Sequence, residues 1–443
     1  MMIYRGTVLD TPESPFAGGE LRAESDAGIA VSDGVITDRG PFDRVRAAHP
    51  DTEVVDLTGG LVLPGLVDTH VHFPQVRVIG GLGMPLLDWL DRCALPEEAR
   101  MAGSDYARAV AADFIDGLIR AGTTTALVFG AHFASAVDCL FERAAAGGVR
   151  VSSGLVVSDR LLRPELLTTP EQAYADGLTL AGRWHRKDRL RYAVTPRFSL
   201  SASGAMLESC AALLQDVDGV LFTSHVNENT AEVETVRGLF PECDSYVDTY
   251  GRHGLLGRRS VLAHNVHPVD AELDVLAAAG ASVAHCPSSN SALGSGLFPL
   301  RRHIEHGVRV ALGTDVGAGT GFSLLREGLQ SYFMQALLGV DGLPLTAAHM
   351  LYLATAAGAA ALEMDGVIGD LSVGKQFDAV WVCPQPGSTL DVVLEHAADP
   401  GDALAKVFAL SGVTDVRGVW VGGDQLRSAA TGPTRSVWSV AGG

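Results

Sequence analysis

The sequence has few cysteines, no recognisable leader and no long apolar run, and each shortage excludes a class of protein. The six cysteines in 443 residues include no CxxC pair, which argues against a thiolate zinc site and a disulfide framework and fits a reducing compartment. The start, MMIYRGTVLDTPESP, lacks the basic region and apolar core of a signal peptide. No stretch of about 18 apolar residues could span a bilayer. We therefore expect a soluble, cytoplasmic protein without a membrane partner.

Basic residues are also scarce. Lysine and arginine total 33 against 52 acidic residues, giving a formal net charge of −19. Proteins that bind nucleic acid need basic surface to neutralise phosphates, so nucleic acid is not expected as a partner. A small neutral substrate is compatible with this charge.

The middle of the chain alternates short apolar runs rich in β-branched residues with Ala- and Leu-rich helical stretches. This alternation predicts a parallel α/β sheet, and eight such units fit a closed (β/α)8 TIM-type barrel. An open doubly wound sheet is the alternative, but no GxGxxG motif follows the first run. The predicted strands are residues 61–72, 123–130, 150–157, 191–198, 220–227, 260–266, 281–287 and 308–315.

The two ends of the chain differ from the middle. Short strand-like pieces separated by Gly, Pro and Asp turns occupy the first 60 residues, and the same style returns after residue 366. We expect residues 1–63 and 366–443 to form one small β-sandwich domain, with the catalytic barrel in residues 64–365.

Polar residues that could bind a metal end several of the predicted strands. His70 and His72 form an HxH pair, and side chains two apart on a strand point to the same side. His225, His264 and Asp315 follow at the same level of the fifth, sixth and eighth strands. Imidazoles with one carboxylate suit Zn²⁺ and leave a position open for water.

A single metal is the better prediction. Two-metal barrels of this architecture bridge their ions with a carboxylated lysine after the fourth strand. Here that position reads TPRFS (195–199), and Lys187 lies before the strand, at the opposite end of the barrel. We therefore expect one Zn²⁺ per chain.

Glu228 lies three residues after His225 in the segment SHVNEN. A carboxylate just past a metal ligand can move a proton between water and a substrate nitrogen. Asp315 can accept a proton from the same water and pass it to a leaving amine. The alternative for Glu228 is a solvent-facing residue that opens the next helix.

Several motifs resemble those of guanine deaminases. They are PGLVDTHVHFPQ (64–75), PLLDWL (85–90), TPRFSLS (195–201), SHVNENTAEV (224–233), LAHNVHP (262–268), AHCPSSNSALGSG (284–296) and LGTDVGAG (312–319), in the family's order and spacing. The resemblance covers about Pro64 to about Gly374 and implies hydrolysis of guanine to xanthine and ammonia. The segment after His264 departs from the family's usual sequence.

The resemblance also implies roles for individual residues. His264 would hydrogen-bond the reacting water and the developing oxyanion and would not need to bind metal, and the chain would form a homodimer. Arg197 offers a planar fork of donors suited to a guanine edge, Gln75 can donate and accept at once, and Phe198 and Trp89 offer aromatic faces. The implied metal ligands are His70, His72, His225 and Asp315, the implied catalytic residues are Glu228, Asp315 and His264, and the implied substrate-binding residues are Gln75, Trp89, Arg197, Phe198, His225 and Glu228.

Other functions remain open at this stage. A deaminase of another nitrogen heterocycle, such as a pterin, an oxidised purine or a triazine, would keep the metal site and Glu228 and change Gln75, Arg197 and Phe198. A cyclic-amide hydrolase would more often use two metals. A catalytically dead scaffold would usually lack ligands, and none of the implied ligands is missing.

Overall fold

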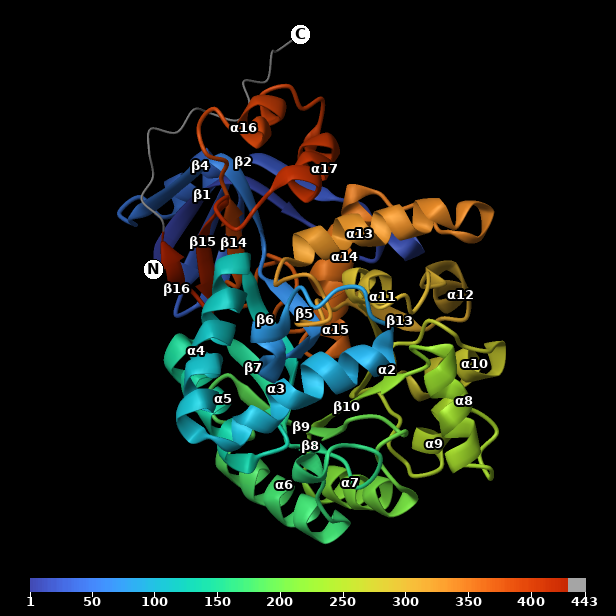
Figure 1. Ribbon diagram of the computed structural model, residues 1–443. Helices are drawn as coiled ribbons and strands as arrows, with labels where there is room; N and C mark the ends of the chain where they lie inside the picture. Colours follow the sequence, from blue (N-terminus) through green and yellow to red (C-terminus); the bar gives the residue numbers. More distant parts are fainter. Residues whose placement is uncertain (429–443) are drawn as a thin grey trace.

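The computed structural model describes residues 1–428 and contains a barrel of parallel strands (Figure 1). Neighbouring strands follow the order β13-β12-β11-β10-β9-β7-β6-β5, and every pair in this order is parallel. The strands are β5 (Leu66–His72), β6 (Thr123–Phe129), β7 (Arg150–Gly154), β9 (Leu190–Pro196), β10 (Leu221–Val226), β11 (Ser260–His264), β12 (Ser282–His285) and β13 (Arg309–Leu312), with the short β8 (Val156–Val157) beside β9.

The barrel closes between its first strand and the residues that follow its last strand. The His72 N–H donates to the Val316 carbonyl at 2.8 Å, and the Asp315 N–H donates to the His70 carbonyl at 2.8 Å. The predicted fold class, an α/β barrel accompanied by a sheet from both termini, is confirmed.

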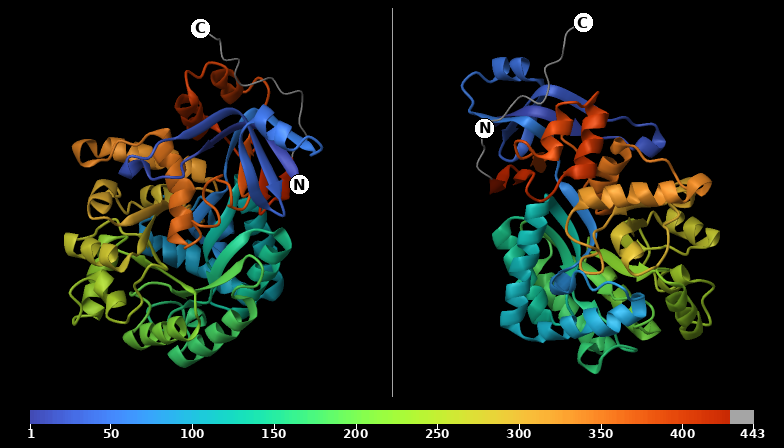
Figure 2. Two further views of the ribbon diagram at one scale, coloured as in Figure 1. Left: turned by 180° about the vertical axis from the view of Figure 1, so that it is seen from behind. Right: turned by 45° about the horizontal axis from the view of Figure 1, so that its top comes forward.

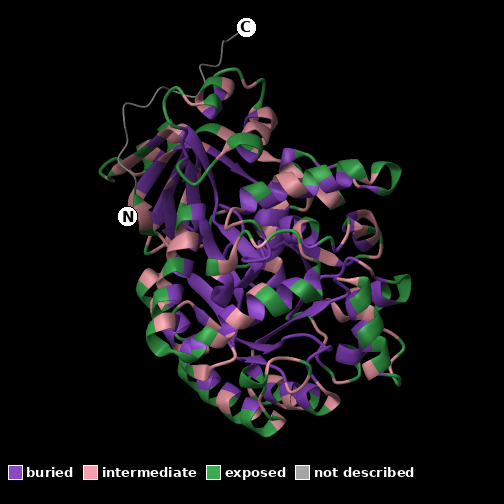
Figure 3. Ribbon diagram, in the orientation of Figure 1, coloured by how far each residue is buried: buried purple, intermediate pink, exposed green. Residues whose placement is uncertain are grey.

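Helices cover the outside of the barrel and present their exposed faces to solvent (Figure 3). In α4, the apolar residues Val110, Phe114 and Leu118 recur at helical spacing and are all buried. The helix ends at Gly122, whose φ of 88° is a left-handed conformation that glycine adopts without strain. These helices are α4 (Ser104–Ala121), α5 (Ala134–Gly147), α6 (Pro170–Trp184), α7 (Gly204–Asp216), α8 (Thr230–Leu239), α9 (Tyr246–Gly251), α10 (Asp270–Ala279), α12 (Leu300–Glu305), α13 (Leu324–Leu337) and α14 (Ala347–Ala354). The short helix α15 (Ala356–Ala361) instead packs against residues inside the barrel, and α11 (Pro287–Ala292) lies at the C-terminal ends of the strands.

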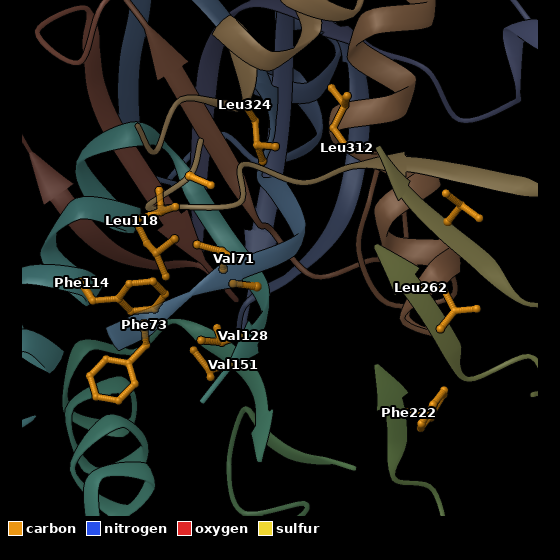
Figure 4. Close-up of a cluster of buried hydrophobic side chains, with 14 of the residues drawn as sticks. Val71, Phe73, Phe114, Leu118, Val128, Val151, Phe222, Leu262, Leu312 and Leu324 are labelled. Carbon is orange, nitrogen blue, oxygen red and sulfur yellow. The ribbon is translucent and has the colours of Figure 1, made fainter. Parts of the chain in front are cut away.

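The apolar layer between strands and helices sets the direction of the polar side chains at the strand ends. Val71 lies in this layer near Phe114 and Leu118 (Figure 4). Because neighbouring residues on a strand point to opposite faces, the side chains of His70 and His72 point away from this layer, into the barrel.

The two ends of the chain build a second, seven-stranded sheet beside the barrel (Figure 2). Its order is β16-β15-β14-β4-β1-β2-β3, and the antiparallel pairing of β4 with β14 joins the two ends. The strands are β1 (Met2–Asp10), β2 (Arg22–Ser32), β3 (Val35–Pro41), β4 (Val54–Pro64), β14 (Ala379–Val382), β15 (Val416–Val421) and β16 (Asp424–Ser428). The helix α1 (Phe42–Ala48) follows β3.

Two details differ from the sequence-based expectation. The predicted strand 61–72 is two strands, because residues 61–64 belong to β4 in the terminal sheet and the barrel strand begins at Leu66. The chain crosses between the sheets at Gly65, where a side chain would collide with Thr124. The C-terminal segment also contains two helices, α16 (Thr389–Leu394) and α17 (Pro400–Leu410), where only strands were expected. The proposed domain limits stay a prediction, and residues 429–443 lie outside the described residues.

A buried ion pair ties the barrel to the terminal sheet. Arg150, at the start of β7, donates from Nε and Nη2 to the Asp378 carboxylate at 2.8 and 2.9 Å. Both residues are buried. Among residues 1–428, no helix is long and apolar enough to cross a membrane.

Candidate active site

Three histidines and one aspartate converge at the strand ends that close the barrel. His70 and His72 end β5, His225 lies near the end of β10, and Asp315 follows β13. All four are buried. The Nε2 atom of His72 lies 3.2 Å from the Nε2 atoms of both His70 and His225. The Oδ1 atom of Asp315 lies 3.3 Å from the Nε2 atoms of His70 and His72.

These distances fit ligand atoms that share one metal ion. Zinc binds imidazole nitrogen at about 2.0–2.1 Å, which places neighbouring ligand atoms of a regular tetrahedron about 3.3–3.4 Å apart. Four of the six separations among these ligand atoms, 3.2 to 3.3 Å, are close to this value. Without a cation, bringing the lone pairs of a carboxylate and neutral imidazoles this close in a buried site would give little favourable interaction energy. The donor set and its spacing therefore fit zinc.

The protonation of the histidines also suits ligation. Burial lowers the pKa of His72 to about 4, against the opposing effect of its contact with Asp315. Burial, followed by the neighbouring His70, lowers the pKa of His225 well below its ordinary value. The Nδ1–H of His225 donates to the Arg197 carbonyl at 2.6 Å, so its Nε2 lone pair faces the cluster.

His264 lies at the edge of this cluster. Its Nε2 atom is 3.5 Å from Glu228 Oε2 and 3.8 Å from Asp315 Oδ2. Its Nδ1–H donates to the Asn290 side-chain oxygen at 3.0 Å, which fixes the ring. His264 also forms a possible ligand group with His70 and Asp315. The contacts of His264 are longer than the 3.2–3.3 Å separations among the other four residues. They favour the expected role of His264 as a hydrogen-bond partner of the reacting water over a role as metal ligand.

Glu228 is a buried acid beside the cluster, not a solvent-facing residue. Burial, followed by repulsion from the Asp315 carboxylate, raises the pKa of Glu228 to about 8. Ser295 donates to Glu228 Oε1 at 3.2 Å, and the backbone N–H of Glu228 donates to Glu232 at 3.1 Å. A carboxyl group held in this way can carry a proton near neutral pH.

One pocket joins this cluster to the residues expected to bind substrate. Leu86, Leu90 and Leu293 add apolar wall, as is usual for a pocket that holds a flat organic ring. The sequence-predicted residues that line it are His72, Gln75, Trp89, Arg197, Phe198, His225, Glu228, His264 and Asp315. His70 does not line the pocket but completes the cluster.

Trp89 and Phe198 line the pocket and also pack in the apolar cluster around it. His285, at the end of β12, is buried and stacks on Phe298 with ring centroids 4.3 Å apart. Lys187 lies before β9, with its Nζ over the ring of Trp184, at the end of that strand opposite to Arg197.

Sequence reasoning missed two buried acids at the site. Glu98, in α3 (Leu95–Ala99), accepts from Arg197 Nη1 at 2.7 and 2.8 Å and from Gln75 Nε2 at 2.7 Å. Asp68, in β5, accepts from the backbone N–H groups of His70 and Thr314. A signal for Asp68 was available in its place two residues before His70, on the same strand. Glu98 stands beside a second glutamate in LPEEAR, and nothing in that segment marks which of the two faces the barrel.

Comparison with known proteins matches residues 61–426 to the amidohydrolase family, and residues 27–51 to an imidazolonepropionase-like composite domain of bacteria. A probable guanine deaminase of Deinococcus radiodurans is 63% identical over 429 residues, which are 96% of this chain and 98% of that protein. The solved structure of Escherichia coli guanine deaminase superposes with a TM-score of 0.93 at 35% identity, over 97% of this chain and 100% of that one. That of guanine deaminase from Bradyrhizobium japonicum gives 0.92 at 31% identity, over 97% and 99%.

Proposed function

The chain belongs to the amidohydrolase family, among its guanine deaminases, and we propose that it hydrolyses guanine to xanthine and ammonia at one zinc ion held by His70, His72, His225 and Asp315. One observation carries the proposal. The cluster of possible metal ligands and the residues implied to bind guanine, Gln75, Arg197 and Phe198, border the same pocket. When bound, zinc would lower the pKa of a coordinated water to about 7 and so supply the nucleophile at neutral pH.

The reaction forms a bond from the water oxygen to C2 of guanine and breaks the bond from C2 to the exocyclic nitrogen. Of the two water protons, one ends on a ring nitrogen of xanthine and the other leaves with ammonia. Glu228 is placed to carry the first proton, because its carboxyl group lines the pocket and its pKa lies near neutral pH. Asp315 accepts the second proton and returns it to the leaving amine.

His264 stabilises the charge that develops on the reacting oxygen. With Nδ1–H committed to Asn290, the Nε2 atom of His264 faces Glu228 and Asp315. With a proton on Nε2, shared with the carboxyl groups of Glu228 and Asp315, His264 can hydrogen-bond an oxygen that gains negative charge.

The pocket holds the purine ring in place for this chemistry. Arg197 and Gln75 present donors and an acceptor to the polar edge of guanine, while Phe198 and Trp89 pack on its faces. Arg197 and Gln75 are both buried, which strengthens their polar contacts.

The substrate assignment is tested by measuring ammonia release over guanine, other purines, pterins and triazines with the purified protein. Guanine should have the highest kcat/KM. Turnover of another ring without turnover of guanine would transfer the assignment to the alternative heterocycle. Metal analysis should find one zinc per chain, and two would favour a cyclic-amide hydrolase.

The proposal includes a cytoplasmic homodimer that acts in purine breakdown. The six free cysteines fit a reducing compartment. Around the C-terminal end of α13, the exposed fractions of Phe333, Leu337 and Val340 are 46%, 75% and 91%. Phe333 and Leu337 are four residues apart and share a helix face, and such an apolar patch suits burial against a second copy. Sedimentation should give a dimer that Leu337→Glu weakens, and a monomeric wild type would exclude it.

A further inference from the structure

Glu98 contacts side chains from three segments that follow the strands β5, β6 and β9. Its carboxylate accepts two hydrogen bonds from Arg197 Nη1, after β9, and one from Gln75 Nε2, after β5. His132, after β6, places Nε2 3.2 Å from Glu98 Oε2, at ion-pair distance but without hydrogen-bond alignment. The side chains of Glu98 and Arg197 are 2% and 3% exposed. Solvent therefore screens this pair little.

Glu98 fixes the orientation of the two residues that face a guanine edge. The Gln75 amide donates from Nε2 to Glu98 and accepts at Oε1 from the Gly317 N–H at 3.2 Å. These two bonds prevent the amide from flipping. The Arg197 guanidinium is planar, so anchoring Nη1 also fixes the plane of its remaining donors.

Glu98 also cancels the charge of Arg197. A buried guanidinium stays protonated, and in a poorly screened pocket it would attract any anionic ligand. Burial would raise the pKa of Glu98, but Arg197, followed by His132, holds that pKa well below its ordinary value, so the carboxylate is charged. The pair is therefore neutral as a unit.

The two purines of the reaction differ in charge. Guanine is uncharged at neutral pH, whereas xanthine, with a second carbonyl beside its ring N–H groups, is a weak acid that ionises near neutral pH. Resting on the proposed function, we propose that Glu98 is a positioning residue that neutralises Arg197 and so makes the pocket prefer uncharged guanine over the xanthine anion. Glu98 thereby limits inhibition by the product.

The test compares Glu98→Gln with Glu97→Gln in the zinc-loaded enzyme. Glu97 is the matched control, since it is buried in the same helix but contacts Tyr106 and Arg100 instead of the pocket. Each variant is assayed for guanine turnover and for inhibition by xanthine, at several pH values across the ionisation of xanthine. A structural role alone would not change the pH trend of inhibition.

In the wild type and in Glu97→Gln, inhibition by xanthine should weaken as pH rises. In Glu98→Gln, it should strengthen with pH, because Arg197 is left unpaired. The KM for guanine should rise about tenfold or more, the scale of losing a partner in a buried charged hydrogen bond, with a smaller change in kcat. A Glu98→Gln enzyme whose xanthine inhibition weakens with pH as in the wild type would overturn the inference.

Arg197→Gln supplies the reverse test if Glu98→Gln fails to fold. It removes the guanidinium that holds the pKa of Glu98 low, so burial raises that pKa and Glu98 ionises only as pH rises. Inhibition by xanthine should therefore fall with pH more steeply than in the wild type. An unchanged or shallower slope would overturn the inference. Failure of the proposed function is distinguishable, because the wild type itself would then not turn over guanine.

Discussion

Asp68 holds the two strands that carry the metal ligands, and replacing it tests that role. It is fully buried in β5. Its Oδ1 accepts from the backbone N–H groups of Thr314 at 3.0 Å and His70 at 3.2 Å, and its Oδ2 accepts from the Thr314 hydroxyl at 2.5 Å. Asp68 therefore joins β5 to the segment that carries Asp315, across the closure of the barrel.

Asp68→Ala removes both acceptor oxygens, and with them three hydrogen bonds, and leaves two backbone N–H groups and a hydroxyl buried without partners. Each unsatisfied group costs about 1–3 kcal/mol. Removal of the poorly solvated carboxylate offsets part of this, so the net loss in the free energy of unfolding should be about 3 kcal/mol near neutral pH. Zinc affinity should fall about 10-fold to 100-fold, as for other residues that support ligands.

Asp68→Asn separates the hydrogen bonds from the charge. The amide oxygen still accepts from both N–H groups, so at acidic pH, where the wild-type carboxyl is protonated, the loss in the free energy of unfolding should stay below about 1 kcal/mol. Burial raises the pKa of Asp68 to about 7, against hydrogen bonds from Thr314 and His70. A folded pKa above the unfolded value of 3.8 means that the wild type loses stability as pH rises between 3.8 and about 7. The asparagine variant should lack this loss, which is about 1.4 kcal/mol per pH unit.

The assay is urea unfolding of metal-depleted protein, followed by fluorescence at several pH values, with zinc affinity from chelator competition. The wild type should lose stability relative to Asp68→Asn as pH rises, and Asp68→Ala should be least stable near neutral pH. The reasoning fails if Asp68→Ala unfolds within about 1 kcal/mol of the wild type and binds zinc equally well.

Three other perturbations probe the site and the fold. Glu228→Gln should retain zinc but lose about 10²-fold to 10⁴-fold in kcat, because the proton carrier is gone; metal analysis beside guanine kinetics checks this, and normal turnover would refute it. Removal of zinc by a chelator should abolish guanine turnover and lower the melting temperature, and zinc should restore both; full activity of the metal-depleted protein would contradict the ligand assignment. Arg150→Met should cost about 3–5 kcal/mol of unfolding free energy, because it leaves Asp378 as an unpaired buried charge between barrel and terminal sheet; a change below about 1 kcal/mol in urea unfolding would show that the pair does not hold the sheets together.

The sequence predicted those parts of the site that local geometry determines. His70 and His72 are two residues apart on one strand, so their direction followed from strand periodicity alone. His225, His264 and Asp315 came together because parallel strands bring their C-terminal ends to one edge of a barrel. Glu228 followed from its place near His225.

Residues that act through tertiary contacts could not be found in this way. Glu98 reaches Arg197 across 99 positions of sequence, and Asp68 reaches Thr314 across 246. Nothing local distinguishes Glu98 from Glu97 until the helix is packed against the barrel. The helices α16 and α17 were missed because the prediction for their segment followed the strand-like residues on either side of it. The spacing of Leu404, Val407 and Phe408, which form one buried face of α17, indicates a helix.

A crystal structure of zinc-loaded Glu228→Gln with guanine would test the central claim most directly, because that claim places metal chemistry and guanine recognition in one pocket. The account predicts one ion about 2.0–2.2 Å from His70, His72, His225 and Asp315, with the purine between Phe198 and Trp89 and its polar edge on Gln75 and Arg197. A purine bound elsewhere, or an ion held by other residues, would contradict it.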